Sequence, residues 1–386
     1  MDDDTVFETQ DLCYKYSRNK NLSIDHVNIK ISRTKKTVLL GANGAGKSTL
    51  FYHFNGVFKP SSGIVYYDGK PLIYDKENLS KLRSDVAVVL QNPDDQIFSA
   101  TVEEDVAFGP LNMGLSHEEV EERIDDALFK VGMTEYRMKP TQQLSYGQRK
   151  RVSFAGAIAM RPKVLILDEP TAGLDPQMSQ ELMELAEQLY NSGTTVIIST
   201  HDIDLAYAWA DEINVLRNGK LVYSGSSEGF YSDPVEVGLA GLMPPAMYGI
   251  NSNLEQLNVF SIPKYPKTRA QLLSKMAPDD LNPGNVFTMN VKDRMDQNMV
   301  DMALEQAGQE TLIGIYGTDT RRLVFEAGLR VDYVFNGIEN VIIEALLGKN
   351  VILCYDDSLE QFVNSQISEI ESFGVSIKVC KVCGDE

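Results

Sequence analysis

The hydrophobic pattern changes its period along the chain and so separates strands from helices. Short apolar runs bounded by polar or turn residues predict buried strands. Before residue 232 these runs are Thr37–Leu40, Val86–Leu90, Val164–Leu167 and Val196–Thr200. Apolar residues at helical spacing follow Ser116, which forms a capping-box signature with Glu119, and they continue to about Val131. The pattern predicts an α/β fold for this part of the chain.

Two segments alternate between apolar and polar residues instead. The segment Val6–Ser32 contains short alternating runs, such as Val27–Ile31, which predict strands of a small antiparallel sheet. Ser61–Tyr67 adds a turn and a strand, and Asp68-Gly69 after it is a hairpin signal. A further helix is predicted over Arg149–Met160.

Beyond residue 232 prolines interrupt the pattern before it becomes regular again. We expect a domain over residues 1–232, a proline-rich linker with short helices over 233–310, such as Arg269–Met276, and a small domain over 311–386. In this last part strands and helices alternate, which predicts a parallel α/β domain. Its predicted strands are Thr311–Tyr316, Val331–Phe335, Val351–Tyr355 and Val375–Val382, and its predicted helices are Arg321–Gly328, Ile338–Leu347 and Ser358–Phe373.

Composition narrows the class of protein. The 386 residues carry a net charge of -19, which argues against nucleic acid as a partner because phosphate backbones require clustered Lys and Arg. A local nucleotide site is still compatible, since backbone donors and Mg²⁺ can supply the positive field. The four cysteines are too scattered for a disulfide framework. No apolar run approaches the roughly 20 residues of a membrane span, so we expect another subunit to do any spanning.

The strongest chemical signal is the glycine-rich stretch Gly41–Thr49, which lies between a predicted strand and a predicted helix. A strand, a loop ending in Gly-Lys-Ser/Thr and a helix form a phosphate-binding loop. Glycines let backbone N–H groups approach phosphate oxygens, and the helix N-terminus favours negative charge. Lys47 is placed to contact the β- and γ-phosphates, and the Ser48 hydroxyl to bind Mg²⁺. The alternative is an ordinary glycine-rich turn.

Polar residues end three of the predicted strands. Asp168 and Glu169 follow the third buried run, and strand alternation points them in different directions. Asp168 can hold Mg²⁺ through water, while Glu169 can orient or deprotonate an attacking water. Gln91, at the end of the second run, can reach Mg²⁺ or that water, although a satisfied polar residue at a strand end is equally compatible. His201 ends the fourth run, where a γ-phosphate contact is expected.

Two further motifs complete the set. Leu144-Ser145-Tyr146-Gly147-Gln148 opens the predicted helix and provides a second anion-binding end, and Thr171–Pro176 is a turn into the next helix. In this order the motifs resemble those of ATP-binding-cassette ATPases, over about Val6–Ser232. Tyr146 departs from the pattern, since a second glycine is common there. Within the class, Gln91–Pro110 is similar to the energy-coupling-factor group, most of all to the ATPases of cobalt or nickel importers.

The resemblance implies a fold and a set of roles. It implies a phosphate-loop α/β core with a small antiparallel β subdomain and a helical subdomain, binding ATP and Mg²⁺. Glu169, His201 and Gln91 would be catalytic, and Ser48, Gln91 and Asp168 would hold the Mg²⁺. Tyr16 would stack on adenine, although core packing also explains a strand tyrosine. The remaining nucleotide contacts would come from Gly41, Asn43, Gly44, Ala45, Gly46, Lys47, Ser48, Thr49, Ser145, Gly147, Gln148 and Asp175.

The resemblance also implies partners. In this class ATP is sandwiched between the phosphate loop of one subunit and the signature of another. A chain with one set of motifs therefore pairs with itself or with a paralogous ATPase. A multi-spanning membrane transport subunit, a substrate-binding membrane subunit and a place at the cytoplasmic face of the membrane are expected, with no nucleic acid. The apolar pair Ile97-Phe98, inside a polar loop, predicts the docking point.

The expected function is an ATP-hydrolysing importer subunit, most similar to those for cobalt or nickel, with vitamin uptake as the alternative. A soluble cassette ATPase acting on DNA or ribosomes usually has two cassettes or a coiled-coil insertion, and this chain has neither. In the last domain, Gly314–Thr320 is a candidate ligand loop, with a plain turn as the alternative, and we expect a regulatory role. Cys380 and Cys383 have metal-ligand spacing, but one such pair is a weak signal.

Overall fold

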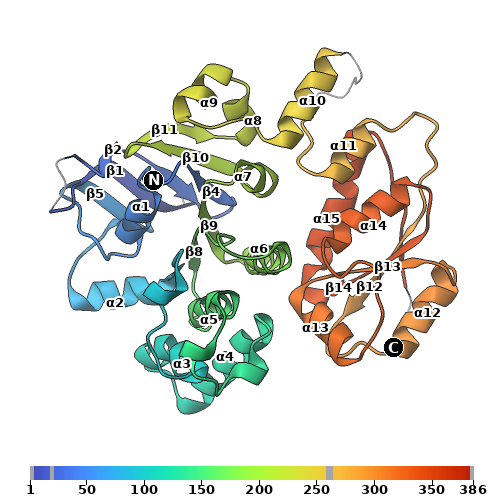
Figure 1. The fold of residues 1–386 in the computed structure, drawn as a ribbon, viewed down its shortest axis with the longest axis horizontal. Coiled ribbons are helices and arrows are strands. Elements are labelled where there is room, and N and C mark those ends of the chain that lie inside the picture. Colours follow the sequence, from blue (N-terminus) through green and yellow to red (C-terminus); the bar gives the residue numbers. More distant parts are fainter. Residues whose placement is uncertain (1–3, 18–20, 258–263, 383–386) are drawn as a thin grey trace. The chain divides into compact units, whose positions relative to one another are not determined.

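The computed structural model describes residues 4–17, 21–257 and 264–382 (Figure 1). It divides the chain into two compact units. The first contains Met1–Leu182 and Gly193–Pro245, and the second contains Met183–Ser192 and Ala246–Glu386. The first unit therefore runs on to Pro245, beyond the boundary expected at residue 232.

A six-stranded sheet forms the centre of the first unit, in the order β11-β10-β4-β9-β8-β7. Pairing is parallel from β10 to β7, and only the β10–β11 hairpin is antiparallel. The buried strands predicted from apolar runs are all present in it. The strands are β4 (Thr37–Leu40), β7 (Val86–Val89), β8 (Val164–Asp168), β9 (Thr195–Thr200), β10 (Glu212–Arg217) and β11 (Lys220–Gly225).

The second sheet of this unit is antiparallel, as predicted, in the order β2-β1-β5-β6 with β3 also paired to β1. The predicted hairpin at Asp68-Gly69 joins its last two strands, and both residues have positive φ angles, of 50° and 69°. The strands are β1 (Thr5–Tyr14), β2 (Ile24–Val27), β3 (Lys30–Ser32), β5 (Ser62–Tyr67) and β6 (Lys70–Pro71).

Helices surround these sheets, and α3, α4 and α5 pack on one another as a helical layer (Figure 1). The capping box predicted at Ser116 is confirmed at the start of α4. The helices are α1 (Lys47–Phe54), α2 (Lys76–Asp85), α3 (Val102–Asn112), α4 (His117–Lys130), α5 (Tyr146–Ile158), α6 (Pro176–Asn191), α7 (Ile203–Trp209), α8 (Ser227–Tyr231) and α9 (Pro234–Ala240). The part of α6 from Met183 onward belongs to the second unit. Short 3-10 turns lie at Pro93–Asp95, Thr134–Tyr136 and Thr141–Gln143.

One hydrophobic cluster fixes α1 between the two sheets. Leu50, Phe51 and Phe54 of this helix are buried among residues of β1 and β4, and Phe54 stacks on Phe7 with ring centroids 4.5 Å apart. Burial of one such side chain stabilises the fold by about 1.5–3 kcal/mol. The loop that leads into α1 is therefore held against a rigid support.

The second unit contains a four-stranded parallel sheet in the order β13-β14-β12-β15. One face packs against α14 and α15, the other against α12 and α13, so the sheet is covered on both sides. The strands are β12 (Val286–Val291), β13 (Leu312–Tyr316), β14 (Val351–Asp356) and β15 (Val379–Lys381). The helices are α10 (Ala246–Gln256), α11 (Arg269–Lys275), α12 (Gln297–Ala307), α13 (Thr318–Glu326), α14 (Gly337–Leu346) and α15 (Glu360–Glu369), with 3-10 turns at Asp357–Leu359 and Ile370–Phe373.

The sequence-based expectation for this unit is wrong in two places. The expected linker over 233–310 is largely folded, and it contains the central strand β12 as well as α12, although the short helix at Arg269 is confirmed. The expected strand Val331–Phe335 is reduced to one bridge between Gly314 and Tyr333. Its ladder stops because the Asp332 carboxylate accepts the Ile313 N–H at 2.8 Å in place of a backbone carbonyl.

Within the described ranges, the structure has no helix that is both long enough and apolar enough to traverse a lipid bilayer.

Candidate functional site

The glycine-rich loop lies where the sequence placed it, between β4 and α1. Gly46 precedes the first helical residue with a φ of 110°, which favours glycine. A Cβ atom there would lie 2.8 Å from the Ser23 carbonyl oxygen, so a side chain has no room. The free N–H groups at the start of α1 therefore lie at the turn, where they can donate to an anion.

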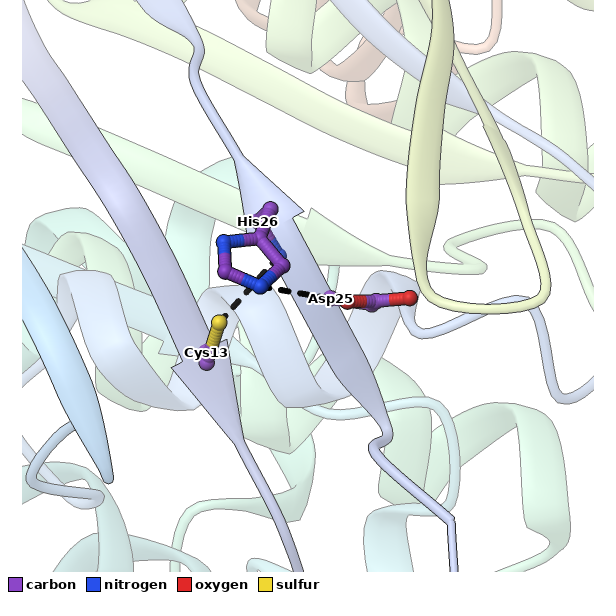
Figure 2. A group of neighbouring side chains, drawn as sticks. All are labelled: Cys13, Asp25 and His26. Carbon is purple, nitrogen blue, oxygen red and sulfur yellow. Dashed lines mark hydrogen bonds and ion pairs between the residues drawn. The ribbon is translucent and has the colours of Figure 1, made fainter.

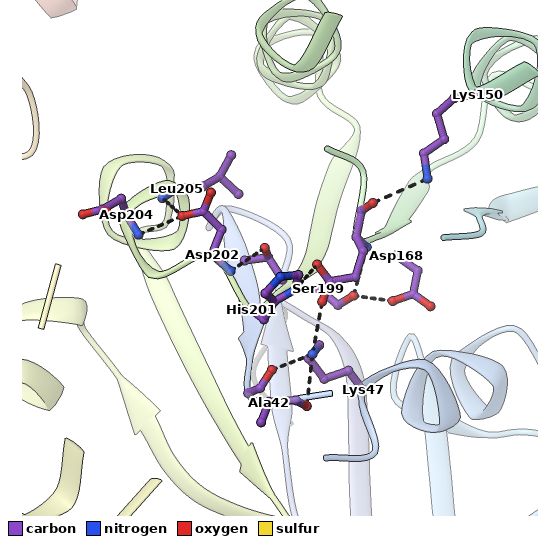
Figure 3. Close-up of polar contacts among 12 residues, drawn as sticks. Ala42, Lys47, Lys150, Asp168, Ser199, His201, Asp202, Asp204 and Leu205 are labelled. Atoms are coloured by element: carbon purple, nitrogen blue, oxygen red, sulfur yellow. Dashed lines mark hydrogen bonds and ion pairs between the residues drawn. The ribbon is translucent and has the colours of Figure 1, made fainter. Parts of the chain in front are cut away.

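Lys47 is buried, and its ammonium group binds the backbone of its own loop. Nζ donates to the Gly41 carbonyl at 2.6 Å and to the Ala42 carbonyl at 3.4 Å. It also lies 3.2 Å from Oε1 of Glu169 at the end of β8. Figure 3 shows Lys47 among the residues that end the strands of the central sheet.

Two adjacent carboxylates end β8 and both are buried. The Ser199 hydroxyl on β9 donates to Oδ1 of Asp168 (Figure 3), which fixes that carboxylate. Glu169 has a φ of 46°, and its N–H is held by the Ser199 carbonyl at 3.0 Å and hydroxyl at 3.2 Å. A non-glycine residue in this left-handed region costs about 1–3 kcal/mol, so the neighbouring strand has to maintain it.

The Glu169 carboxylate connects two of the other predicted residues. Its Oε2 lies 2.9 Å from Nδ1 of His201, and its Oε1 faces the Lys47 ammonium. Glu169 is buried, whereas about half of the His201 side chain is exposed. A buried carboxylate between a lysine and a histidine can hold a polar group, such as a water, in a fixed orientation.

A cavity of about 870 Å³ opens beside these residues. It brings together Tyr16, the loop from Asn43 to Thr49, Gln91 and Glu169. The Tyr16 hydroxyl lies 3.1 Å from Oγ1 of Thr49, so the tyrosine is tied to the first turn of α1. The other lining residues are Asn21, Leu22, Ser23, Asn218 and Gly219.

The remaining predicted residues do not line this cavity in the described chain. Ser145 and Gln148 form a capping box at the start of α5, where the Ser145 hydroxyl accepts from the Gln148 N–H and Oε1 of Gln148 accepts from the Ser145 N–H. Gly147 packs closely against Met178, and Asp175 accepts the Met178 N–H at 2.8 Å. These residues therefore form a separate feature of the first unit.

The comparisons with known proteins identify the family. A family model described as ABC transporter matches residues 24–172. The chain is 49% identical, over 241 residues, to the energy-coupling factor transporter ATP-binding protein EcfA of Methanosphaera stadtmanae, covering 62% of this chain and 86% of that one. The chain belongs to the ABC transporter ATP-binding proteins of the energy-coupling factor group. It is an ATPase.

Two further comparisons extend this assignment. The ABC ATPase is 34% identical over 390 residues to EcfA2 of Methanospirillum hungatei, covering 99% of this chain and 97% of that one. The solved structure of cbiO1 from Clostridium perfringens, described as part of the ABC transporter complex cbiONQ, is 41% identical. It matches with a TM-score of 0.55, covering 66% of this chain and 97% of that chain. The first unit therefore has the ABC ATPase fold.

Lys150 is a residue of the ABC ATPase whose position the sequence did not reveal. Its buried ammonium donates to the carbonyls of Leu90 at 2.9 Å and Gln91 at 2.8 Å, and reaches the Glu169 carbonyl at 3.5 Å. Burial lowers the pKa of Lys150 to about 8. The three donors of this one lysine thus tie the ends of β7 and β8 together and position the backbone of Gln91 and Glu169. In the sequence Lys150 is the middle of three consecutive basic residues, Arg149 to Arg151, and nothing in that pattern distinguishes it from its neighbours.

Tyr146, the residue that departs from the family pattern, has a partner of its own. Its hydroxyl donates to the Gln91 carbonyl at 3.3 Å, and its ring would collide with any Cβ on Gly173. The Gln91 side chain is exposed, although its backbone is fixed by Tyr146 and Lys150. The substituted signature position therefore contacts the Gln91 loop.

The loop that carries Ile97 and Phe98 borders a second cavity, of about 790 Å³. The Phe98 ring is 66% exposed and meets the half-exposed Phe108 edge-on, with centroids 4.7 Å apart. The buried Asp105 carboxylate accepts the N–H groups of Phe98 at 3.1 Å and Ser99 at 3.0 Å. Phe98, on a loop that Asp105 fixes, and Phe108, on α3, thus form one exposed aromatic pair.

The cavity wall around Asn218 could be predicted only in part from the sequence. Asn218-Gly219 is a recognisable hairpin turn, and its φ angles of 49° and 79° agree with that. Its position beside the phosphate loop follows from the Gly219 N–H donating to the Ala45 carbonyl at 2.9 Å, a contact between residues far apart in the sequence.

In the second unit the predicted ligand loop is engaged by the protein itself. Asp356, at the end of β14, accepts the N–H groups of Thr320 at 2.6 Å and Asp319 at 3.3 Å, at the start of α13. A Cβ on Gly317 would lie 2.3 Å from the same carboxylate. Two of the anion-binding donors of this turn are therefore occupied. Of the predicted cysteine pair, Cys380 lies on β15 and Cys383 lies outside the described residues.

Proposed function

We propose that this ABC ATPase hydrolyses ATP within a nucleotide-sandwich dimer and drives the uptake of cobalt or nickel ions through a membrane transport subunit. The observation that carries the proposal is the arrangement of Lys47, Glu169 and His201 beside one cavity. Glu169 lies 3.2 Å from the lysine and 2.9 Å from the histidine. The proposed roles of individual residues follow from this geometry.

Glu169 is proposed to orient the attacking water and accept its proton. His201 holds Oε2 of the carboxylate, and His201 is exposed enough to reach a γ-phosphate from the cavity side. Lys47 would exchange its contacts with the Gly41 and Ala42 carbonyls for phosphate oxygens. With these roles, the protein positions the reacting groups and stabilises the charge that develops on the phosphate.

The residues present fit a Mg²⁺ ion. Asp168 offers a buried carboxylate whose Oδ1 is fixed by Ser199, and Ser48 offers a hydroxyl at the start of α1. Gln91 lines the same cavity and can add an amide oxygen. Bound there, the ion would neutralise charge on the phosphates. Tyr16, held by Thr49 at the cavity wall, is proposed to stack on the adenine.

The second half of the nucleotide site is proposed to come from another subunit. Ser145, Gly147, Gln148 and Asp175 are absent from the residues that line the cavity in the described chain. Their capping box leaves the Ser145 hydroxyl hydrogen and the first N–H groups of α5 available for a phosphate. A dimer with itself or with a paralogue would place this end over ATP bound to the first subunit.

The groove beside Phe98 and Phe108 is proposed to receive an apolar helix end of the membrane transport subunit. The aromatic pair is exposed, and Met113 and Met160 line the same cavity. Methionine side chains adapt to the shape of an apolar partner. The ATPase would then lie at the cytoplasmic face of the membrane, with a substrate-binding membrane subunit in the same complex.

The proposed cargo rests on resemblance. The segment Gln91–Pro110 is similar to the ATPases of cobalt or nickel importers, and the match to cbiO1 supports this assignment. Vitamin uptake is the second candidate, because membership of the energy-coupling factor group does not by itself specify a cargo.

The test measures cobalt and nickel accumulation in cells that express the native transport genes with wild-type ATPase or with Glu169→Gln. Glu122→Gln, an exposed glutamate on α4, is the matched control. We expect Glu169→Gln to abolish uptake of one metal and Glu122→Gln to leave it unchanged. Unchanged uptake of both metals in Glu169→Gln would overturn the cargo, and labelled vitamins would then be measured in the same strains.

A further inference from the structure

A thiol, an imidazole and a carboxylate come together on the antiparallel sheet of the first unit. Cys13 lies on β1, and Asp25 and His26 lie on β2. One ligand atom from each residue lies within 4.8 Å of the other two. Figure 2 shows the His26 ring between the Cys13 sulfur and the Asp25 carboxylate. None of the three belongs to the nucleotide site described above.

The orientation of His26 is set by a second carboxylate. Its Nδ1 lies 2.5 Å from Oδ1 of Asp11, so Nδ1 carries the proton that is shared with Asp11. The other ring nitrogen, Nε2, lies 3.8 Å from Oδ1 of Asp25. Metal-binding histidines typically donate their second ring N–H to a carboxylate, which fixes the ring and makes the metal-binding nitrogen more basic. The Asp11–His26 pair has this arrangement.

The backbone is distorted in a way that brings the three side chains together. Asp11 and His26 have φ angles of 50° and 52°, and the pairing of β1 with β2 shifts register between Leu12 and Tyr14, where Cys13 lies. The His26 N–H donates to the Cys13 sulfur at 3.3 Å. A left-handed residue costs about 1–3 kcal/mol, and two of them facing each other across a strand pair point to a function.

The local charge is suited to a cation. Asp11 and Asp25 flank the imidazole. The facing cation is Lys220, which lies 3.2 Å from Oδ2 of Asp25 and leaves Oδ1 directed at His26. Cys13 is buried and is a free thiol among the cysteines that the structure describes, so its sulfur is available as a ligand.

We propose that Cys13, Asp25 and His26 bind a divalent transition-metal ion of the Zn²⁺, Co²⁺ and Ni²⁺ class. Asp11 holds the His26 ring in place through its hydrogen bond to Nδ1. Sulfur, nitrogen and oxygen ligands together favour these borderline ions over Mg²⁺ and Ca²⁺, which prefer oxygen alone. Metal–ligand bonds in such sites are roughly 2.0–2.3 Å long, so the three ligand atoms have to move slightly toward one another when the ion binds. Water completes the coordination.

Metal binding would cross-link β1 to β2 close to the nucleotide cavity. Tyr16 and Ser23, which line that cavity, follow Cys13 and precede Asp25 in the chain. The site does not depend on the proposed function, because it uses neither the catalytic residues nor the cargo. It would stabilise the strand pair that precedes and follows the segment with Tyr16, the residue proposed to stack on adenine.

The test is a Co²⁺ titration of the full chain, freed of metal and without nucleotide, followed by absorption spectroscopy. A thiolate bound to Co²⁺ gives a charge-transfer band in the near ultraviolet, and we expect one such site per chain. Cys13→Ser should remove the band. Asp11→Asn should keep the band but weaken binding by about 10- to 100-fold, as loss of the supporting carboxylate does elsewhere.

His26→Asn is the second ligand variant, and asparagine tolerates the same backbone conformation. It should weaken Co²⁺ binding at least as much as Asp11→Asn does. Cys380→Ser and His117→Asn are the matched controls, because both side chains lie on other elements. The proposal is wrong if the wild-type chain shows no band at millimolar Co²⁺, if Cys13→Ser keeps it, or if Cys380→Ser loses it. Thermal unfolding without metal verifies that each variant is folded.

Discussion

The Lys47 ammonium lies 3.2 Å from Oε1 of Glu169, and both side chains are buried. The pair links the loop after β4 to the end of β8, two strands that are not neighbours in the sheet. Triphosphate oxygens and the Glu169 carboxylate therefore compete for the same ammonium group. A buried charge that loses its partner destabilises the folded protein. Removing the charge of Lys47 or of Glu169 therefore changes the environment of the other residue.

We expect Glu169→Gln to lower the rate of ATP hydrolysis by about 10²–10⁴-fold, since it removes the proposed base. ATP binding should be retained or strengthened, because the variant no longer competes for Lys47. Phosphate release and equilibrium binding of a labelled nucleotide measure the two effects, with Glu122→Gln as the control. A variant that hydrolyses ATP within a few-fold of wild type would contradict the role of Glu169.

If each nucleotide site is built from the phosphate loop of one subunit and the signature end of α5 of the other, two inactive variants should restore ATPase activity when they are mixed. Lys47→Ala removes the phosphate-loop lysine, and Ser145→Arg blocks the signature end of α5. In a sandwich dimer, a mixture contains dimers with one fully intact site, so we expect ATPase activity to return on mixing. Each variant alone should stay inactive. If each site were complete within one chain, mixing would give no more activity than the two variants give separately.

The exposed pair Phe98 and Phe108 predicts that a charged substitution there uncouples the ATPase from the membrane subunit without inactivating it. Phe98→Asp places a charge in the groove and should disrupt association with the membrane subunit, while the ATPase activity of the isolated chain changes by less than about 2-fold, since the substitution lies on the surface. Co-purification with the membrane partner and transport by the complex are measured. Ile73→Asp, at another exposed apolar position, is the matched control. Normal association of Phe98→Asp would place the docking surface elsewhere.

His53 predicts a loss of stability in acid. It is fully buried on α1, its Nδ1 lies 2.7 Å from the Thr49 carbonyl, and its Nε2 has no hydrogen-bond partner among the described residues. Burial lowers the pKa of His53. The unfolded chain therefore binds a proton more readily than the folded chain below about pH 6.5, and stability falls as the pH drops through that range, by at most about 1.4 kcal/mol per pH unit from this group.

The measurement is denaturant unfolding of wild type and His53→Phe between pH 7.5 and 5, with His117→Asn as an exposed control. We expect the stability gap between wild type and His53→Phe to change in favour of the variant as the pH falls. A gap that stays constant across this range would show that His53 is not buried in its neutral form.

Much of the nucleotide site could be predicted because its residues follow strands in a fixed order. Asp168 and Glu169 end the apolar run of β8, and Lys47 follows the loop after the apolar run of β4; parallel strands bring such ends to one edge. Lys150 could not be predicted, because its role depends on a helix packing over two strand ends. Asp11 and His26 gave no signal, since their contact depends on positive φ angles and a register shift rather than on spacing.

The fold of the second unit was harder to predict for a related reason. Thr288 and Asn290 interrupt the apolar pattern of β12, and surrounding prolines suggested a linker, although the strand is central. Val331–Phe335 has the apolar pattern of a strand, but the Asp332 side chain ends its ladder after one bridge. The hydrophobic pattern indicates which side chains are buried, but it does not indicate which backbone groups form hydrogen bonds with another strand.

The place of β12 in its sheet has a consequence for how the chain is made. This strand is synthesised first among the four, yet its partners are β14 at Val351–Asp356 and β15 at Val379–Lys381. Until those residues emerge from the ribosome, both edges of β12 carry open backbone groups, and such edges recruit strands from other chains. The second unit therefore folds only after Lys381 has left the ribosome, and a ribosome that stalls before residue 379 releases a product prone to aggregation.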